Sequence, residues 1–231
     1  MTWHNMSDDG NTILHDTLKT ERVDETNVFL TDAPHPAGLA TKWGLRLRGK
    51  LRARPQGVKQ FEFGLMVTGR GKLFVSNRLV IDNWTRQRQG EAFFNLGTLE
   101  ERGTVDVAPG ESPQILLEFS NTSGPREGEI EGQPDQAGFR LGGRDVSDPD
   151  EAMHDAVECA KAADVAVVVV GLSADWESEG YDRTTLALPG RTDELVEKVA
   201  KANPRTIVVT QSVRLFVLRL SDGLLADADR C

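Results

Sequence analysis

The chain has 231 residues, a formal net charge of -9 and 39% hydrophobic residues, so it is mildly acidic and has enough apolar material for sizeable cores. This acidity argues against nucleic acid or an anionic membrane as a partner. No apolar run approaches the roughly 18 residues of a membrane span, and the first residues, MTWHNMSDDGNT, lack an apolar signal core, so the sequence at face value predicts a cytoplasmic, non-secreted protein.

The two cysteines and the glycan acceptor triplets add little about chemistry. Cys159 and Cys231 belong to no CxxC or Cys/His pattern. They predict neither a metal site nor a disulfide framework, and no cofactor is expected. Three Asn-x-Ser/Thr triplets begin at Asn5, Asn83 and Asn121, and these would accept glycans if a fuller version entered the secretory pathway.

The sequence pattern of the first half of the chain changes once, from a polar segment to short segments that alternate apolar and polar residues. Residues 1–37 are polar and read as irregular, with one weak strand candidate at 27–31 that a DAPHP turn ends. From 41 to 119 short alternating strands are separated by Gly, Pro and Asn, which predicts an all-β sandwich or barrel: KWGLRLRGKLRA, FEFGLMVTG, GKLFVSNRLVIDN, GTVDVAPG and PQILLEFS. Basic residues cluster at 42–54, but apolar residues alternate with them, which favours a half-exposed strand.

One hairpin stands out in this region. GKLFV and LVIDN predict two strands joined by a turn at Ser76-Asn77. The segment 61–103 around this hairpin resembles the PA14 domain. The amino-terminal strands of a complete PA14 domain are not visible, which predicts a truncated start. Some PA14 lectins bind sugar through calcium held by paired aspartates, but here the hairpin ends Ile81-Asp82-Asn83, so no calcium is predicted.

The loop after the hairpin, residues 86–97, contains the adjacent aromatics Phe93 and Phe94. They cannot both face the core if the backbone is extended, and an exposed ring is a good platform for the apolar face of a sugar. The alternative is that both rings fold back onto the barrel. In β-glucosidases that carry a PA14 domain, the domain lies over the active-site mouth and helps to select the aglycone, so the resemblance favours the platform.

The second half begins after a loop. Residues 120–143 are rich in Gly, Pro and charge and predict a loop with one closing strand at 138–141, which places a domain boundary near Gly143. Residues 151–162 have apolar positions at helical spacing and acids near the start, as an amphipathic helix does. Val165–Val170 predicts a strand buried on both faces of a parallel sheet.

A carboxylate-rich loop follows this strand. Its motif is WESEGYDR, framed by VVVVGL before it and LPG after it. In open α/β sheets, ligands bind beyond the carboxyl ends of the strands. The motif resembles the second domain of family 3 glycoside hydrolases, the β-glucosidase family, and the resemblance covers residues 146 to about 212. Without it, a solvated acidic loop with no chemistry would be the simpler interpretation.

The resemblance assigns roles within the loop. Retaining glycoside hydrolysis needs a nucleophile and an acid that later acts as a base, and Glu179 of the EGY segment matches the family's acid/base. Glu177 is the less favoured alternative. Such an acid stays protonated when desolvation or nearby negative charge raises its pKa, and Asp175, Glu177 and Asp182 would supply the charge. The expected substrate-binding and loop-shaping residues are Trp176, Tyr181, Asp182, Arg183, Phe93 and Phe94.

A second helix and strand complete this half. Residues 192–203 form an amphipathic pattern with Thr192 as the expected N-cap, and 206–210 predict another buried strand. This order fits the family's α/β sandwich, with parallel strands joined by right-handed crossovers. From Val213 to Cys231 the sequence departs from the family and reads as translated intron, frameshift or divergence. A sheet without its later strands would leave an open apolar edge.

Taken together, the sequence predicts an α+β multidomain protein, with a PA14-like all-β domain over 1–142 and a partial α/β sandwich over 146–231. The resemblance implies a β-glucosidase that hydrolyses terminal β-D-glucosyl residues of β-glucosides and oligosaccharides. The family's nucleophile lies on an amino-terminal (β/α)8 barrel that this chain lacks, so the chain alone is expected to be inactive. The alternative is a non-catalytic carbohydrate-binding protein. A nucleotide-binding domain is disfavoured because no Gly-rich phosphate loop follows either strand.

Overall fold

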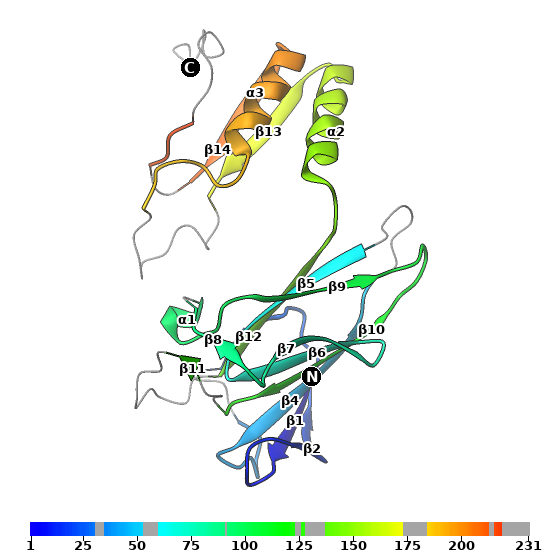
Figure 1. Ribbon diagram of the computed structural model, residues 1–231, viewed down its shortest axis with the longest axis vertical. Coiled ribbons are helices and arrows are strands. Elements are labelled where there is room, and N and C mark those ends of the chain that lie inside the picture. Colours follow the sequence, from blue (N-terminus) through cyan, green and yellow to red (C-terminus); the bar gives the residue numbers. More distant parts are fainter. Residues whose placement is uncertain are drawn as a thin grey trace. The chain divides into compact units, whose positions relative to one another are not determined.

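The computed structural model describes residues 1–30, 35–52, 60–90, 92–122, 126–127, 137–172, 184–212 and 215–218. The chain divides into two compact units, Met1–Val146 and Ser147–Cys231, which we call the β unit and the α/β unit (Figure 1). The division lies three residues beyond the boundary expected near Gly143, because the last strand of the β unit continues to Asp145.

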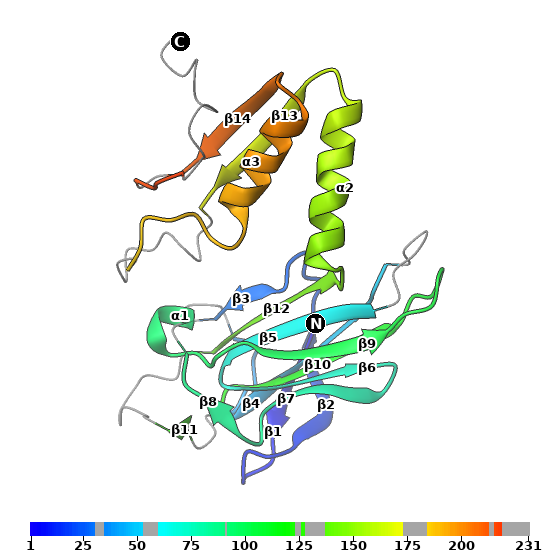
Figure 2. The same cartoon turned by 45° about the horizontal axis from the view of Figure 1, so that its top comes forward.

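The β unit contains two main antiparallel sheets whose inner faces share one core (Figures 1 and 2). The mainly β architecture expected for residues 41–119 is confirmed. The six-stranded sheet has the order β2 (Ile13–Thr20), β1 (Thr2–Met6), β4 (Trp43–Lys50), β10 (Gln114–Ser120), β6 (Arg70–Val75) and β7 (Arg78–Asn83). The four-stranded sheet has the order β3 (Asn27–Phe29), β12 (Gly138–Asp145), β5 (Gln60–Thr68) and β9 (Glu101–Asp106). The short elements are β8 (Gln87–Arg88), α1 (Ala92–Asn95) and β11 (Arg126–Glu127).

Aromatic side chains join the two sheets in the core. Phe119 on β10 is fully buried, and its ring centroid lies 6.0 Å from that of Trp43 on β4 and 5.6 Å from that of Phe139 on β12. Successive residues of a strand point to opposite faces, so the residues between these core positions face outward. On β4, Trp43, Leu45 and Leu47 are buried while Arg48 and Lys50 are exposed, which confirms the half-exposed basic strand.

The β6–β7 hairpin has the turn that its sequence predicts. Ser76 and Asn77 both have positive φ, at 48° and 64°, as a type I′ turn requires. Such a turn twists in the same sense as the flanking strands, and Val75 accordingly pairs with Arg78.

The prediction that the segment before residue 27 is irregular is wrong, because this segment supplies β1 and β2. The strand candidate at 27–31 is confirmed by β3. β1 lies between β2 and β4 and buries Trp3 and Met6. Its pairing with β2 shifts register on both sides of His4, and this irregularity breaks the alternation by which a strand is recognised in sequence. Long-range pairing with β4, rather than local pattern, therefore makes this segment a strand.

His4 is a buried polar residue on this strand, with only 3% of its surface exposed. Its Nδ1 lies 3.0 Å from the carbonyl oxygen of Asp16 and its Nε2 lies 2.8 Å from the hydroxyl oxygen of Thr2. A carbonyl oxygen only accepts, so Nδ1 carries the proton. Burial lowers the pKa of His4 from its ordinary value of 6.5, and the cations Arg46 and Arg48 act in the same direction.

This lowered pKa predicts a pH-dependent contribution to stability. Since the folded state binds the His4 proton less readily than the unfolded state, the contribution is complete above about pH 6.5 and is lost as the pH falls below that value. Urea unfolding of the wild type and of His4→Gln should therefore give a smaller difference at about pH 5.5 than at about pH 7.5. Equal differences at the two pH values would contradict this account of His4.

The α/β unit has the order α2 (Pro149–Ala162), β13 (Ala166–Gly171), α3 (Thr192–Ala202) and β14 (Thr206–Gln211), with β13 and β14 parallel. The expected order of helix, strand, helix and strand is therefore present. α2 starts two residues earlier than expected because Asp148 caps it, accepting a hydrogen bond from the backbone nitrogen of Asp150 at 2.8 Å.

Three details of this unit correct the sequence-based expectations. β14 is not the buried strand expected at 206–210, because Ile207 and Val209 are 55% and 43% exposed and Val208 is only partly buried against the core. Thr192 is not the N-cap of α3, because Arg191 occupies that position and the Thr192 hydroxyl donates back to the carbonyl of Pro189. β13 is buried on one face only. Ala166, Val168 and Val170 pack on α2 and α3, whereas Val167 and Val169 are 59% and 63% exposed, because nothing in the described α/β unit covers the second face.

Part of the atypical carboxyl-terminal segment is described. Phe216 and Leu218 pack against the core of the α/β unit. The backbone nitrogen of Val217 donates to the carbonyl of Leu186 at 2.8 Å. Phe216 and Leu218 thus pack within the α/β unit, whereas Leu215 is 83% exposed. Residues 213–214 and 219–231 lie outside the described residues.

Candidate active-site elements

The acidic loop expected to carry the chemistry lies outside the described residues. Glu179, the expected acid/base, falls there, and so do Trp176, Tyr181, Asp182 and Arg183. The structure does describe the two ends of this loop, Leu172 after β13 and Thr184 before α3. The expected roles of the loop residues therefore remain predictions.

The loop leaves the sheet where β13 and β14 end side by side. Gly171 pairs with Gln211, and the backbone nitrogen of Leu172 donates to the carbonyl of Gln211 at 3.0 Å. A Cβ atom on Gly171 would lie 1.7 Å from the Gln211 carbonyl oxygen, so this close approach requires glycine. The glycine that ends the valine run thus fixes where the loop departs, at the carboxyl edge of a parallel pair, where α/β sheets bind ligands.

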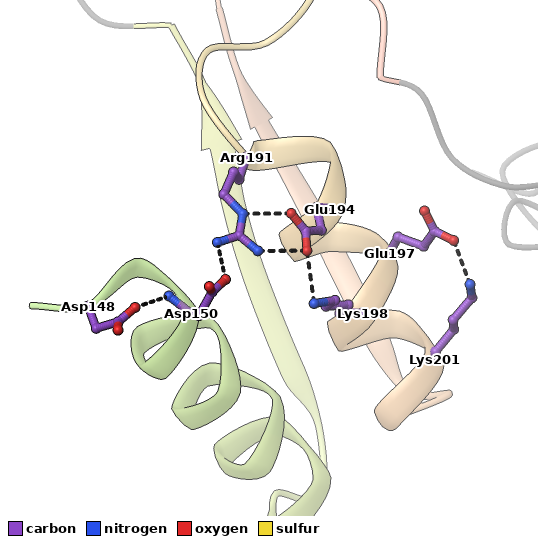
Figure 3. A network of polar contacts seen from close by, with 7 residues as sticks. All are labelled: Asp148, Asp150, Arg191, Glu194, Glu197, Lys198 and Lys201. Atoms are coloured by element: carbon purple, nitrogen blue, oxygen red, sulfur yellow. Dashed lines mark hydrogen bonds and ion pairs between the residues drawn. The ribbon is translucent and has the colours of Figure 1, made fainter.

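An arginine holds the starts of the two helices together at the end of the same loop (Figure 3). Arg191 Nε lies 2.6 Å from Glu194 Oε2, its second terminal nitrogen lies 2.8 Å from Glu194 Oε1, and its first lies 2.6 Å from Asp150 Oδ1. The Arg191 guanidinium, with Lys198 behind it, lowers the pKa of Glu194 to about 2. These groups are exposed, so their main effect is to fix geometry, and Arg191 directly follows the LPG segment.

The two adjacent phenylalanines lie on a left-handed turn, α1. Phe93, Phe94 and Asn95 have φ values of 54°, 59° and 66°. The Phe93 ring stacks on Phe29 with centroids 5.3 Å apart, and the Arg140 guanidinium lies 5.9 Å from the Phe93 ring centroid. The Phe94 ring is 77% exposed, and its centroid lies 6.1 Å from that of Phe29. One ring is therefore packed and the other faces solvent, although the backbone is not extended as the sequence argument assumed.

Left-handed backbone costs roughly 1–2 kcal/mol per residue for side chains other than glycine, so the surroundings must hold this turn. Two backbone hydrogen bonds close the base of its loop. The Gly97 nitrogen donates to the Ala92 carbonyl at 2.8 Å, and the Gly90 nitrogen donates to the Gly97 carbonyl at 3.0 Å. The strained turn is thus closed at its base, and this closure projects Phe94 outward.

A buried polar network anchors both ends of this loop. Asn83 Nδ2 donates to the Leu65 carbonyl at 3.1 Å and to Thr98 Oγ1 at 2.8 Å. Gln87 Nε2 donates to the Asn83 carbonyl at 2.9 Å and to the Gly69 carbonyl at 2.8 Å. Asn83, Gln87 and Thr98 are all buried. Since Gln87 precedes the loop and Thr98 follows it, Asn83 connects the two ends.

The sequence analysis did not identify this network. A signal was present, because Asn83 lies two residues after Ile81 in LVIDN and so occupies a core-facing position of β7. A polar residue at such a position must find buried partners. Those partners come from β5 and from beyond the loop, and no local pattern indicates them.

Within the described part of the chain, no group of three or more His, Cys, Asp or Glu side chains is placed to hold a metal ion. None of the described helices has both the length and the apolar character needed to cross a bilayer.

The chain is similar in sequence to fungal proteins described as probable beta-glucosidases. The chain is 42% identical over 190 residues to probable beta-glucosidase J of Neosartorya fischeri, which covers 81% of this chain and 22% of that protein. It is 34% identical over 194 residues to probable beta-glucosidase I of Aspergillus clavatus, covering 83% of this chain and 23% of that protein. The chain thus spans about a fifth of the length of the curated relatives it matches.

A solved structure is similar across both units. The beta-glucosidase from Kluyveromyces marxianus in complex with glucose has a TM-score of 0.73 and 30% sequence identity, covering 91% of this chain and 23% of that chain. The model of the glycosyl hydrolase family 3 C-terminal domain matches residues 15–226. Because this match includes most of the β unit and of the α/β unit, the chain belongs to the glycosyl hydrolase family 3 C-terminal domain family.

Proposed function

We propose that this chain is a part of a retaining β-glucosidase that hydrolyses terminal β-D-glucosyl residues, and that it carries the acid/base loop and the lid of that enzyme. The observation that carries the proposal is the similarity, over 91% of the chain, to a beta-glucosidase in complex with glucose. The chain spans about a fifth of its relatives, so the proposal includes a preceding (β/α)8 barrel that supplies the nucleophile and most of the glucose pocket. Sequencing the transcript upstream of Met1 should reveal that barrel, and its absence would overturn the enzymatic proposal.

The α/β unit would supply the acid/base. In the sequence, Glu179 lies between Gly171, which ends β13 at the carboxyl edge of the parallel strands, and Arg191, the N-cap of α3. In the proposed mechanism the Glu179 carboxyl gives its proton to the leaving-group oxygen, while the barrel carboxylate attacks the anomeric carbon. The resulting carboxylate of Glu179 then takes a proton from water, which hydrolyses the glycosyl-enzyme. The Arg191 contacts to Asp150 and Glu194 support a fixed return of this loop.

The β unit would act as a PA14-like lid that contacts the aglycone. The exposed ring of Phe94, projected by a strained and anchored turn, supports this role. A flat apolar ring with its edge in water suits the apolar face of a sugar. The same feature supports the second candidate, a carbohydrate-binding protein without catalysis, which predicts measurable oligosaccharide affinity for the chain in the absence of a barrel.

Two substitutions distinguish the proposed sugar contact of Phe94 from the packing of Phe93 on Phe29. Phe94→Ala in the full-length enzyme should raise KM for a cello-oligosaccharide by about twofold to tenfold, since an aromatic contact contributes about 0.5–1.5 kcal/mol. Its melting temperature should fall less than that of Phe93→Ala, because the Phe94 ring is 77% exposed and lies farther from the Phe29 ring, at 6.1 Å. Phe93→Ala should lower the melting temperature, because that ring stacks on Phe29. Leu79→Ala, another exposed apolar residue, is the control for KM, and an unchanged KM in Phe94→Ala would remove Phe94 from the site.

A further inference from the structure

Asn83 begins one of the three glycan acceptor triplets, Asn83-Trp84-Thr85. Acceptor triplets that carry glycans are expected in surface loops. Asn83 is instead the last residue of β7 and has 0% of its surface exposed. Its position in the fold thus conflicts with the sequence rule that marks it as an acceptor.

Besides the lack of space, the hydrogen bonds of the Asn83 side-chain nitrogen also oppose the attachment of a glycan. Both hydrogens of Asn83 Nδ2 are used, one toward the Leu65 carbonyl and one toward Thr98 Oγ1. Attachment of a glycan forms a bond between this nitrogen and the anomeric carbon of a sugar. It breaks the bond of that carbon to the pyrophosphate of a lipid-linked donor and releases one amide proton. The modified nitrogen keeps a single hydrogen, so one of its two buried partners would lose its donor.

The other two triplets differ in this respect. Asn5 Nδ2 makes one exposed hydrogen bond, to the Gly38 carbonyl at 3.2 Å. Asn121 Nδ2 likewise makes one exposed hydrogen bond, to the Thr41 carbonyl at 2.8 Å. An amide nitrogen that carries a sugar retains one hydrogen, so each of these single bonds is compatible with modification, and both side chains are partly exposed.

We infer that folding closes the Asn83 acceptor site, so that glycans on the folded protein are confined to Asn5 and Asn121. A glycan at Asn83 and the native β unit exclude each other, because the sugar would occupy the space between β7, β5 and Thr98. In a compartment that attaches N-glycans, chains modified at Asn83 before folding cannot form the network that anchors the Phe94 loop. Glycosylation of this triplet before folding therefore keeps the chain from reaching the native fold.

The test maps glycans on the full chain. The 231-residue chain is secreted from an N-glycosylating host, the folded monomer is isolated by size, and former glycan sites are marked with ¹⁸O by enzymatic deglycosylation and identified by mass spectrometry. The monomer should carry no mark at Asn83. A folded monomer with native circular dichroism and a marked Asn83 would overturn the inference.

A second arm tests whether the fold, rather than the triplet's own sequence, gives this protection. Phe119→Asp places a charge in the core of the β unit and keeps the same triplet in a full chain that does not fold. Asn83 should be marked in this variant when it is recovered from the cell. An unmarked Asn83 there would show that the local sequence prevents modification, and the inference would fail.

Discussion

Replacing Glu179 by glutamine in the full-length enzyme should lower kcat for an alkyl β-glucoside by about two to four orders of magnitude, the usual contribution of a general acid/base. Glutamine keeps the size of the side chain but has no proton to give to the leaving oxygen and no basicity to activate water. The loss should be smaller for an aryl glucoside with a good leaving group, because its departure needs little protonation.

Added azide provides the sharper test of this role. Azide attacks the glycosyl-enzyme without help from a base, so it should restore part of the turnover of Glu179→Gln with an aryl β-glucoside. Glu158→Gln, an exposed glutamate on α2, is the matched control and should leave kcat unchanged. Full activity in Glu179→Gln would contradict the assignment, and loss with azide rescue in Glu177→Gln instead would move the role to Glu177.

Asn83→Ala should destabilise the β unit by about 2–4 kcal/mol, because it removes the buried hydrogen bonds of the Asn83 side chain to the Leu65 carbonyl and to Thr98 Oγ1. The same change removes the bond to Thr98 that connects residue 83 to the far end of the loop carrying Phe94, while the bond from Gln87 to the backbone carbonyl of residue 83 stays. The variant should therefore lose the Phe94 contribution to KM as well as stability.

Urea unfolding of the full chain, followed by tryptophan fluorescence, measures this loss. Trp3, Trp43 and Trp84 are all buried in the β unit and report on it. Asn27→Ala on β3 is the control, since Asn27 is exposed, and it should change stability by no more than about 0.5 kcal/mol. If both variants lost the same amount, the buried network would not contribute to stability as proposed.

Local patterns predicted the parts of the fold that local forces determine. The β6–β7 hairpin follows from alternation around a turn whose residues tolerate positive φ, and α2 follows from apolar positions at helical spacing with acids near its start. The acidic loop was recognisable because its motif resembles a family and not because of its periodicity. Its geometry stays outside the described residues, so the roles of Glu179 and its neighbours rest on that resemblance.

Features that depend on long-range contacts were missed or misread. β1 lacks clean alternation, because a buried histidine and two register shifts interrupt it, and its pairing with β4 and β2 determines its structure. β2 in turn pairs with β1. The exposed face of β13 was misread because a run of valines has the same sequence whether or not a second layer covers it. The left-handed turn at Phe93 and Phe94 depends on hydrogen bonds at the base of its loop, which no propensity of the residues indicates.

Hydrolysis of 4-nitrophenyl β-D-glucoside by the 231-residue chain alone and by the full-length enzyme tests the central claim most directly. The claim is that this chain supplies an acid/base and a lid but needs a nucleophile from another domain. The account predicts no turnover above the uncatalysed rate for the chain alone and clear turnover for the enzyme that includes the barrel. Turnover by the chain alone, or none by the full-length enzyme, would contradict it.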